Sequence, residues 1–253
     1  MAINFPTSLD NFTNPSSGNT LDSPSHSLQH SDINDAVEAM QRKVGVGTAV
    51  AGSASAGQVL TISAAGTSTW STPTAGGLIQ IVPTSVAVGS GSGSVDSIGN
   101  VTFTGASSIS LNGCFTSTYD NYRIIINLET TSSGTTSSLR FRASGTDNSS
   151  SNYAYSYHFL TTANTTYTQG NANTTTSFRI GFSDGGTDMV IIDVFNPMKA
   201  FRTGYQSVFN GKEVANFTSE RNQGQMSVTT AYDGFTYFQN SMAGTIRVYA
   251  YSD

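Results

Sequence analysis

The sequence carries tyrosine and amide side chains close together in its C-terminal half. Tyr155 and Tyr157 stand two residues apart, so a β-strand would place both on one face. Tyr167 and Asn171 follow in a stretch rich in Ser, Thr and Asn, which predicts an exposed loop over residues 161–177. Aromatic rings beside amide groups form sugar-stacking surfaces, so we take these four residues as candidate glycan-binding residues. A tyrosine stripe is equally typical of the inner or intersubunit face of a β-sandwich.

Two short patterns contain groups that bind metal ions in other settings. His26 and His30 are four residues apart, a spacing that suits a metal when both lie on a helix. We expect the helix to begin after them, which leaves both histidines outside it. Asp184–Asp188 offers oxygen ligands of the kind that Ca²⁺ prefers, but Asp and Gly are also typical of hairpin turns. We favour the turn, and we predict neither a bound metal nor a cofactor.

The acidic residues form no recognisable catalytic pattern. Glycoside hydrolysis needs two carboxylates facing each other across a cleft, and spacing singles out no such pair among the acids after residue 78. The sequence also contains no G-x-S-x-G nucleophile motif, no phosphate-binding loop and no H-E-x-x-H metal motif. We therefore expect a binding protein rather than an enzyme.

Charge and composition argue against two further classes of function. The formal net charge is −5 and the 11 Lys and Arg residues form no run, which argues against nucleic-acid binding. No apolar stretch approaches the ~20 residues that cross a bilayer, so we expect no membrane insertion. Cys114 is the only cysteine, so an intrachain disulfide is impossible and assembly in a reduced cytosol is compatible with the sequence.

One convincing helix is expected, within residues 31–47. Ser31 or Asp32 offers an N-cap, because a short side-chain oxygen can accept from the free N–H groups of the first turn. Gly45 stands where the helix should stop. The apolar positions recur at spacings of four, three and four, at Ile33, Val37, Met40 and Val44. Such a narrow seam is typical of a helix that packs against copies of itself, which predicts a homotrimer held partly by these four residues.

The residues around this helix carry a family resemblance. In chain order they are Phe5–Pro15, Leu21–His26, Gln29-His30 and Asn34–Ala39. They resemble the N-terminal segment of tailed-bacteriophage virion proteins, which opens tail-fibre, head-fibre and minor structural proteins. The resemblance covers residues 5–47 and implies a virion part that is assembled in the host bacterial cytoplasm. It also implies that residues 1–30 form an extended arm that anchors the chain to other virion proteins.

Strand-like runs dominate the remaining sequence. Residues 48–77 form a Gly/Ser/Thr-rich neck, in which Val59–Ile62 and a return strand ending at Trp70 predict a hairpin. Residues 78–253 predict an antiparallel β-sandwich knob of the jelly-roll kind, because short alternating runs follow one another without a second helix. The expected strands are Leu78–Val82, Val101–Thr104, Ser108–Leu111, Tyr122–Leu128, Ser138–Ala143, Tyr153–Leu160, Ser177–Phe182, Met189–Phe195, Tyr205–Phe209, Gln225–Thr230, Phe235–Phe238 and Thr245–Tyr251.

Two of these runs are apolar at consecutive positions, Ile124–Ile126 and Met189–Ile192. We expect them to be central strands covered on both faces, one of them at a subunit contact.

These observations predict a fibre or spike-like virion appendage whose β knob contacts a glycan or protein on the host surface. The main alternative is a capsid decoration, baseplate or tail component that binds no receptor. A depolymerase spike is disfavoured, because such spikes are long repetitive β-helices and no fixed repeat is visible here.

Overall fold

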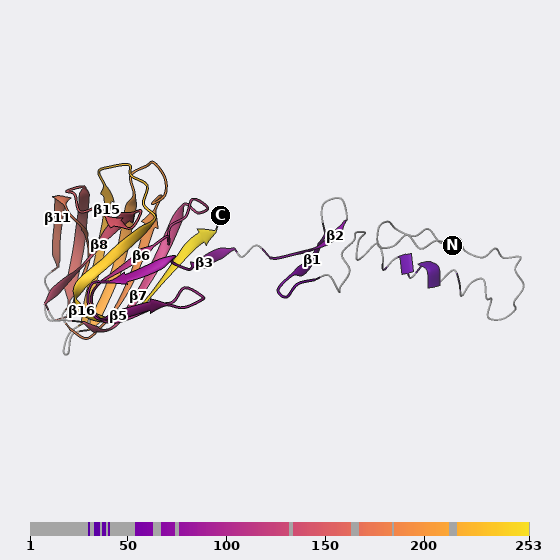
Figure 1. Cartoon of the computed structure of the whole chain (residues 1–253), viewed down its shortest axis with the longest axis horizontal. Coiled ribbons are helices and arrows are strands. Elements are labelled where there is room, and N and C mark those ends of the chain that lie inside the picture. Colours follow the sequence, from indigo (N-terminus) through magenta and orange to yellow (C-terminus); the bar gives the residue numbers. More distant parts are fainter. Residues whose placement is uncertain are drawn as a thin grey trace, which may run out of the picture. The chain divides into compact units, whose positions relative to one another are not determined.

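The computed structural model describes residues 30, 33–35, 37–38, 40, 54–62, 67–73, 76–131, 134–162, 167–183, 185–212 and 217–252. The chain divides into two compact units, Met1–Thr74 and Ala75–Asp253, and each is described by itself (Figure 1). The second unit starts close to residue 78, where the knob was expected. Among the described residues, no helix is both long and apolar enough to span a membrane.

The first unit contains the expected hairpin. Strands β1 (Val59–Ile62) and β2 (Ser68–Ser71) pair antiparallel, with Leu60 opposite Trp70. The hydroxyl of Ser71 donates to Oγ1 of Thr61 at 3.0 Å across the pair. A two-stranded sheet of this size is marginal alone, and Val59, Leu60 and Ile62 are exposed in it.

The same unit contains helical residues at the expected place. Ile33, Val37 and Met40 are helical, and the side chains of Ile33 and Met40 are exposed. Val44 lies outside the described residues. His30 is helical as well, although we expected it to precede the helix, and the expected N-cap residues Ser31 and Asp32 lie outside the described residues.

The second unit is mainly β and every strand pairing in it is antiparallel, as the sequence predicts. Thr, Val, Ile, Tyr and Phe are abundant in these strands because their side chains fit a pleated, half-buried surface. The strands are β3 (Gly77–Ile81), β4 (Ser85–Val88), β5 (Ser92–Val95), β6 (Val101–Asn112), β7 (Asn121–Thr131), β8 (Thr135–Ala143), β9 (Thr146–Asp147), β10 (Tyr153–Thr161), β11 (Thr168–Thr175), β12 (Phe178–Ser183), β13 (Thr187–Phe195), β14 (Gly204–Lys212), β15 (Phe217–Met226) and β16 (Gly234–Ser252).

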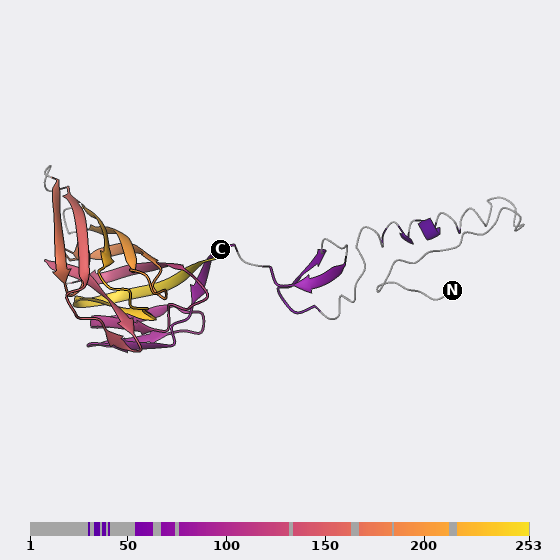
Figure 2. The ribbon, with the colours of Figure 1, turned by 90° about the horizontal axis from the view of Figure 1, so that it is seen from above.

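The long strand β16 joins two layers of sheet (Figures 1 and 2). Its C-terminal half pairs with β7 and continues the large sheet, in the order β11-β10-β15-β14-β13-β7-β16. Its N-terminal part pairs with β8, which in turn pairs with β12. The register shifts between Phe238 and Met242 separate the two parts. As a result, β12 lies over β14 and β15 without pairing with them.

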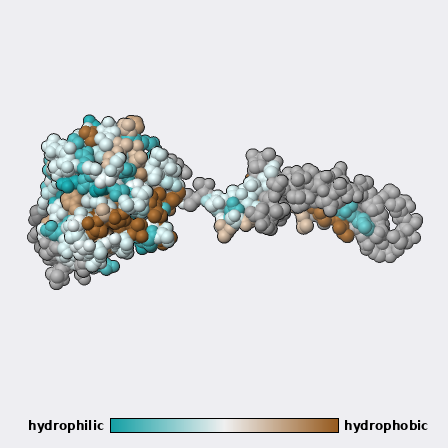
Figure 3. Space-filling model, in the orientation of Figure 1, coloured by the Kyte–Doolittle hydropathy of each residue, from teal (hydrophilic) through white to brown (hydrophobic). Residues whose placement is uncertain are grey.

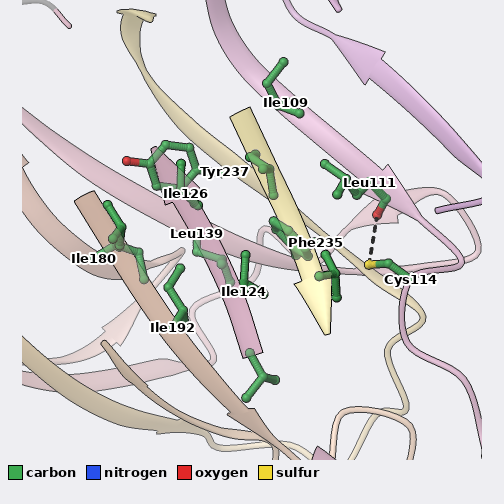
Figure 4. Close-up of a cluster of buried hydrophobic side chains, with 14 of the residues drawn as sticks. Ile109, Leu111, Cys114, Ile124, Ile126, Leu139, Ile180, Ile192, Phe235 and Tyr237 are labelled. Carbon is green, nitrogen blue, oxygen red and sulfur yellow. Dashed lines mark hydrogen bonds between the residues drawn. The ribbon is translucent and has the colours of Figure 1, made fainter. Parts of the chain in front are cut away.

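Apolar side chains from both layers form one core (Figure 4). Ile124 and Ile126 of β7 and Ile192 of β13 meet Leu139 of β8 and Ile180 of β12, and all five are fully buried. Burial of such side chains is the main stabilising contribution to a β-sandwich core. Cys114 is also buried there, and burial raises the pKa of its thiol.

Only one face of the large sheet is covered by the second layer. Met189 is 60% exposed and Ile191 is 40% exposed, while Val190 and Ile192 between and beside them are buried. Within the single chain, the second layer therefore covers Ile124–Ile126 and Met189–Ile192 on one face, and the expected contact of one of them with another subunit stays a prediction. We call the uncovered side of the sheet its outer face.

Several strand boundaries differ from the expected ones. The runs expected at Val101–Thr104 and Ser108–Leu111 form the single strand β6, and the last two expected runs form the single strand β16. Strand β15 spans Phe217–Met226 instead of Gln225–Thr230. The segment expected as a loop at 161–177 contains β11, whose polar residues leave no hydropathy pattern although their backbone pairs with β10.

Candidate functional site

The antiparallel register aligns polar side chains in rows across the outer face. Residues directly opposite each other on neighbouring strands point to the same side of a sheet. One row, read from β11 to β7, contains Asn171, Ser156, Gln223, Gln206, Asp193 and Arg123. The next row contains Gln169, His158, Arg221, Val208, Ile191 and Ile125.

Two adjoining hollows lie along these rows, with volumes of about 480 and 540 Å³. Both are lined by Gln206 and Gln223, so we treat them as one outer-face groove. Small residues at Ala154, Ser156 and Gly204 line its second part. The other outer-face side chains in its lining are Arg123, His158, Asn173, Ile191, Asp193, Phe195, Val208, Arg221 and Gln225.

Asp193 is fixed by three side chains. The guanidinium of Arg123 donates to both carboxylate oxygens, at 2.8 and 2.9 Å, and the hydroxyl of Tyr251 donates to Oδ1 at 2.7 Å. The amide of Gln206 donates to Oδ2 at 3.2 Å. Burial raises the pKa of Asp193, but these hydrogen bonds outweigh it and hold the pKa below its usual value. The carboxylate of Asp193 is thus ionised, and both of its oxygens accept hydrogen bonds. It is therefore poorly suited to proton transfer.

Arg221 stands in the groove with no carboxylate partner among the described residues. It is exposed, and its cross-strand neighbours are His158 on β10 and Val208 on β14. The described ion pairs join other residues. The groove therefore contains one neutralised arginine, Arg123, and one arginine whose charge is available to a ligand.

Tyr167 and Asn171, two of the four candidate residues, lie beside this groove. The ring of Tyr167 is 54% exposed, and its centroid lies 5.4 Å from that of the His158 ring. Asn171 is exposed on β11 opposite Ser156. An exposed ring next to a row of amides is the arrangement that we expected for sugar stacking.

The other two candidates, Tyr155 and Tyr157, turn to the opposite side of the sheet. Tyr155 packs against the core, and the Arg179 guanidinium lies 4.4 Å from the centre of the Tyr157 ring. Arg179 donates to both carboxylate oxygens of the fully buried Glu220, at 2.6 and 2.9 Å. These two rings thus join β10 to β12, as in the packing alternative, and the four candidates do not form one surface.

Sequence reasoning missed the glutamines and Arg221, because β15 was not expected before residue 225. Three of the inward-facing residues of β15, Thr218, Glu220 and Asn222, are polar and buried, so apolar alternation is missing over most of the strand. A usable signal was nonetheless present. The polar stretch 217–226 has the length of a strand, and it follows the expected strand at 205–209 after a short connection, as the second strand of an antiparallel pair does.

The strands on either side of the segment Asp184–Asp188 do not form the hairpin that we expected. These strands, β12 and β13, do not pair because they belong to different layers, and Asp184 itself lies outside the described residues. Gly185 and Gly186 have φ values of 89° and 116°, which other residues rarely adopt. Within the part of the chain that the structure describes, no cluster of three or more His, Cys, Asp or Glu side chains could hold a metal ion. His26 lies outside that part.

Comparisons with known proteins leave the chain without an assigned relative. No family model matches it, and no curated protein matches it. The chemistry of the outer-face groove is therefore the basis on which function is inferred.

Proposed function

We propose that the chain is a homotrimeric tailed-bacteriophage virion appendage whose β knob binds a glycan on the host surface through the outer-face groove. The resemblance of residues 5–47 to phage virion proteins supports the virion location and the anchoring role of residues 1–30. In this proposal the helix seam at Ile33, Val37, Met40 and Val44 joins three copies. The exposure of Ile33 and Met40 in a single chain supports it, because such apolar side chains gain from a partner.

The row of amides carries the proposal for glycan binding. Gln206, Gln223, Gln225 and Asn171 each offer a donor and an acceptor, which matches a sugar hydroxyl that both donates and accepts. Beside Gln206 on β14, the floor of the groove is apolar at Val208 and Ile191. A few placed polar groups on an apolar floor are typical of ligand sites. Weak contacts of this kind suit an appendage, because three knobs on each appendage and many appendages on a particle give avidity.

The same groove supports binding rather than hydrolysis. Asp193 is the only carboxylate among the described residues that line it. A glycosidase needs a second carboxylate within about 5–10 Å, and it needs one of the two to exchange a proton. Asp193 is held by Arg123, Tyr251 and Gln206 in its ionised form.

The proposal also includes the type of sandwich and the neck that carries it. The two layers that share β16 make a sandwich, and we assign it as a jelly-roll-like knob on a narrow trimeric neck. Apolar surface gathers on the second unit where Figure 1 draws β3 (Figure 3). Leu78 in β3 and Val82 directly after it are exposed there.

A structural component without receptor binding is the second candidate function. Exposed apolar side chains also occur on the outer face, at Met189, Ile191, Val208 and Phe217. Contacts between copies or with other virion proteins would cover them, as in a capsid decoration or a baseplate component.

Adsorption distinguishes the two candidates. The purified full-length protein should bind cells of the host and compete with phage adsorption, and Tyr167→Ala should weaken both effects. Arg202→Ala is the control, since Arg202 is exposed and lines neither hollow. If the protein binds neither cells nor envelope glycans while the particle needs it for stability, the decoration function is correct instead.

A further inference from the structure

We propose that the outer-face groove selects an acidic polysaccharide, with a sugar carboxylate bound by Arg221. This inference rests on the proposed glycan binding and adds the chemical class of the ligand. It is carried by the charges of the groove, the position of Arg221 in the sheet and the neighbours of its guanidinium.

The groove is locally positive although the chain is acidic. The charge of Arg123 is cancelled by Asp193 in a bidentate pair. Arg221 remains unpaired among the described residues, so Arg123, Asp193 and Arg221 in the lining sum to one positive charge. The chain as a whole carries a formal net charge of −5. An isolated arginine in a groove of an acidic protein favours a ligand of opposite charge.

A second arginine lies on the same row of the outer face. Arg247 on β16 is opposite Ile125 on β7, and its guanidinium donates to Oδ1 of Asn100 rather than to a carboxylate. From Arg221 to Arg247 the row crosses Val208, Ile191 and Ile125, which spans about 19 Å at the usual strand spacing. An extended chain with an acid on each repeat can reach both arginines, whereas a single small anion cannot.

Two acids near these arginines leave Arg221 as the stronger site. Asp96 lies close to Arg247, because the side chain of Asn100 accepts from Arg247 and donates to the Asp96 carboxylate. Glu129 lies on β7 four residues beyond Ile125, about 13 Å along the strand and three strands away from Arg221. At that distance from Arg221, the exposed charge of Glu129 is largely screened at physiological salt.

The neighbours of Arg221 favour a carboxylate attached to a sugar. Gln223 lies two residues along β15 on the same face, about 7 Å away, a span comparable with one substituted hexose. An arginine binds a planar carboxylate through two parallel hydrogen bonds, and the adjoining apolar floor of Val208 strengthens them by excluding water. The amides then take up hydroxyl groups of the same sugar or of its neighbour.

The test is an array of purified bacterial polysaccharides, acidic and neutral, probed with the full-length protein. Every acidic polysaccharide that binds is measured again after chemical reduction of its carboxylates to alcohols. We expect binding to be confined to acidic polymers, to fall about tenfold or more on reduction, and to weaken steeply with salt. Arg221→Gln should cause a similar loss, Arg221→Lys a smaller one, and Arg202→Gln none.

Three results would overturn the inference, and they are distinguishable. If carboxyl-reduced polymers bind as well as the native ones, the selection for acids is wrong while glycan binding stands. If no polysaccharide of either kind binds, both proposals fail. If Arg221→Gln changes the oligomeric state, measured by light scattering, the outer face is a contact between copies and not a ligand site.

Discussion

Arg123 and Asp193 lie opposite each other on β7 and β13 and form a bidentate ion pair, with Nε–Oδ1 and Nη2–Oδ2 distances of 2.8 and 2.9 Å. The pair is completed by Tyr251, whose hydroxyl donates to the same carboxylate, and burial raises the pKa of Tyr251 to about 12. These contacts join three neighbouring strands at the edge of the groove. They fix the guanidinium of Arg123 and leave Arg221 as the arginine open to a ligand.

Asp193 should make stability depend on acid pH. Its pKa is lowered in the folded chain, so its contribution is present above the unfolded pKa and is lost as pH falls through the folded pKa. Asp193→Asn should therefore lower the free energy of unfolding at pH 7 by about 1–3 kcal/mol and should flatten its dependence on pH below about 4. Denaturant titrations from pH 7 to pH 2 measure this. Equal pH profiles for the variant and the wild type would contradict the assignment.

Asp188 should affect the pH dependence of stability in the direction opposite to Asp193. It is buried on the inner side of β13, its Oδ2 has no hydrogen-bond partner among the described residues, and burial raises its pKa despite contacts with Ser183 and Thr131. The pKa of Asp188 is thus higher in the folded chain than in the unfolded chain. The free energy of unfolding therefore rises as pH falls from above the folded-state pKa to the unfolded-state pKa. Asp188→Asn should therefore increase the free energy of unfolding at pH 7 by about 1 kcal/mol. A loss of stability at pH 7 would instead indicate that the ionised form is required.

The Glu220–Arg179 pair should be a stabilising link between the layers and not part of the binding site. Glu220 is fully buried on β15, and Arg179 comes from β12 and lies against the ring of Tyr157. Glu220→Gln leaves a largely buried guanidinium without its counter-charge and should cost about 3–5 kcal/mol. Glu129→Gln, at an exposed carboxylate, is the matched control and should cost less than about 0.5 kcal/mol. Thermal and denaturant unfolding compare the two variants, and equal effects would refute the link.

The helix seam predicts the oligomeric state. Val37→Glu should weaken assembly, since a charge buried among apolar partners costs several kcal/mol. Asp35→Asn, at an exposed helical position, should leave assembly unchanged. Light scattering on the full-length chain measures the mass of each variant. A stable monomer for the wild type would show that the seam does not join copies.

The strands with apolar alternation could be predicted, and those with polar inward faces could not. In β7, β8 and β10 most of the inward-facing alternate residues are apolar and meet the other layer, so periodicity located these strands within a few residues. In β15 the inward residues Thr218, Glu220 and Asn222 are stabilised by partners from elsewhere in the fold. Asn222, for example, donates to the carbonyl oxygen of Ile180 at 2.8 Å. No local pattern reveals a partner 42 residues away.

The candidate site could be predicted only in part for the same reason. Tyr167 and Asn171 were found because exposed aromatic and amide residues are recognisable one by one. Tyr155 and Tyr157 face the second layer because β12 lies on that side of the sheet. The position of β12 depends on its pairing with β8 and on the pairing of β8 with β16, which no local pattern reveals. The groove itself exists only through the register of four strands, because Ser156, Gln223, Gln206 and Asp193 are far apart in the sequence.

The most direct test of the account is the binding of host-envelope polysaccharide to the full-length protein, compared between the wild type and Gln223→Ala. Gln223 lines both parts of the groove and makes no described side-chain contact that the fold requires. The account predicts that the wild type binds, that Gln223→Ala binds several-fold more weakly, and that both unfold at the same denaturant concentration. Undiminished binding by Gln223→Ala and Arg221→Gln alike would contradict it, because the ligand would then be held elsewhere on the chain.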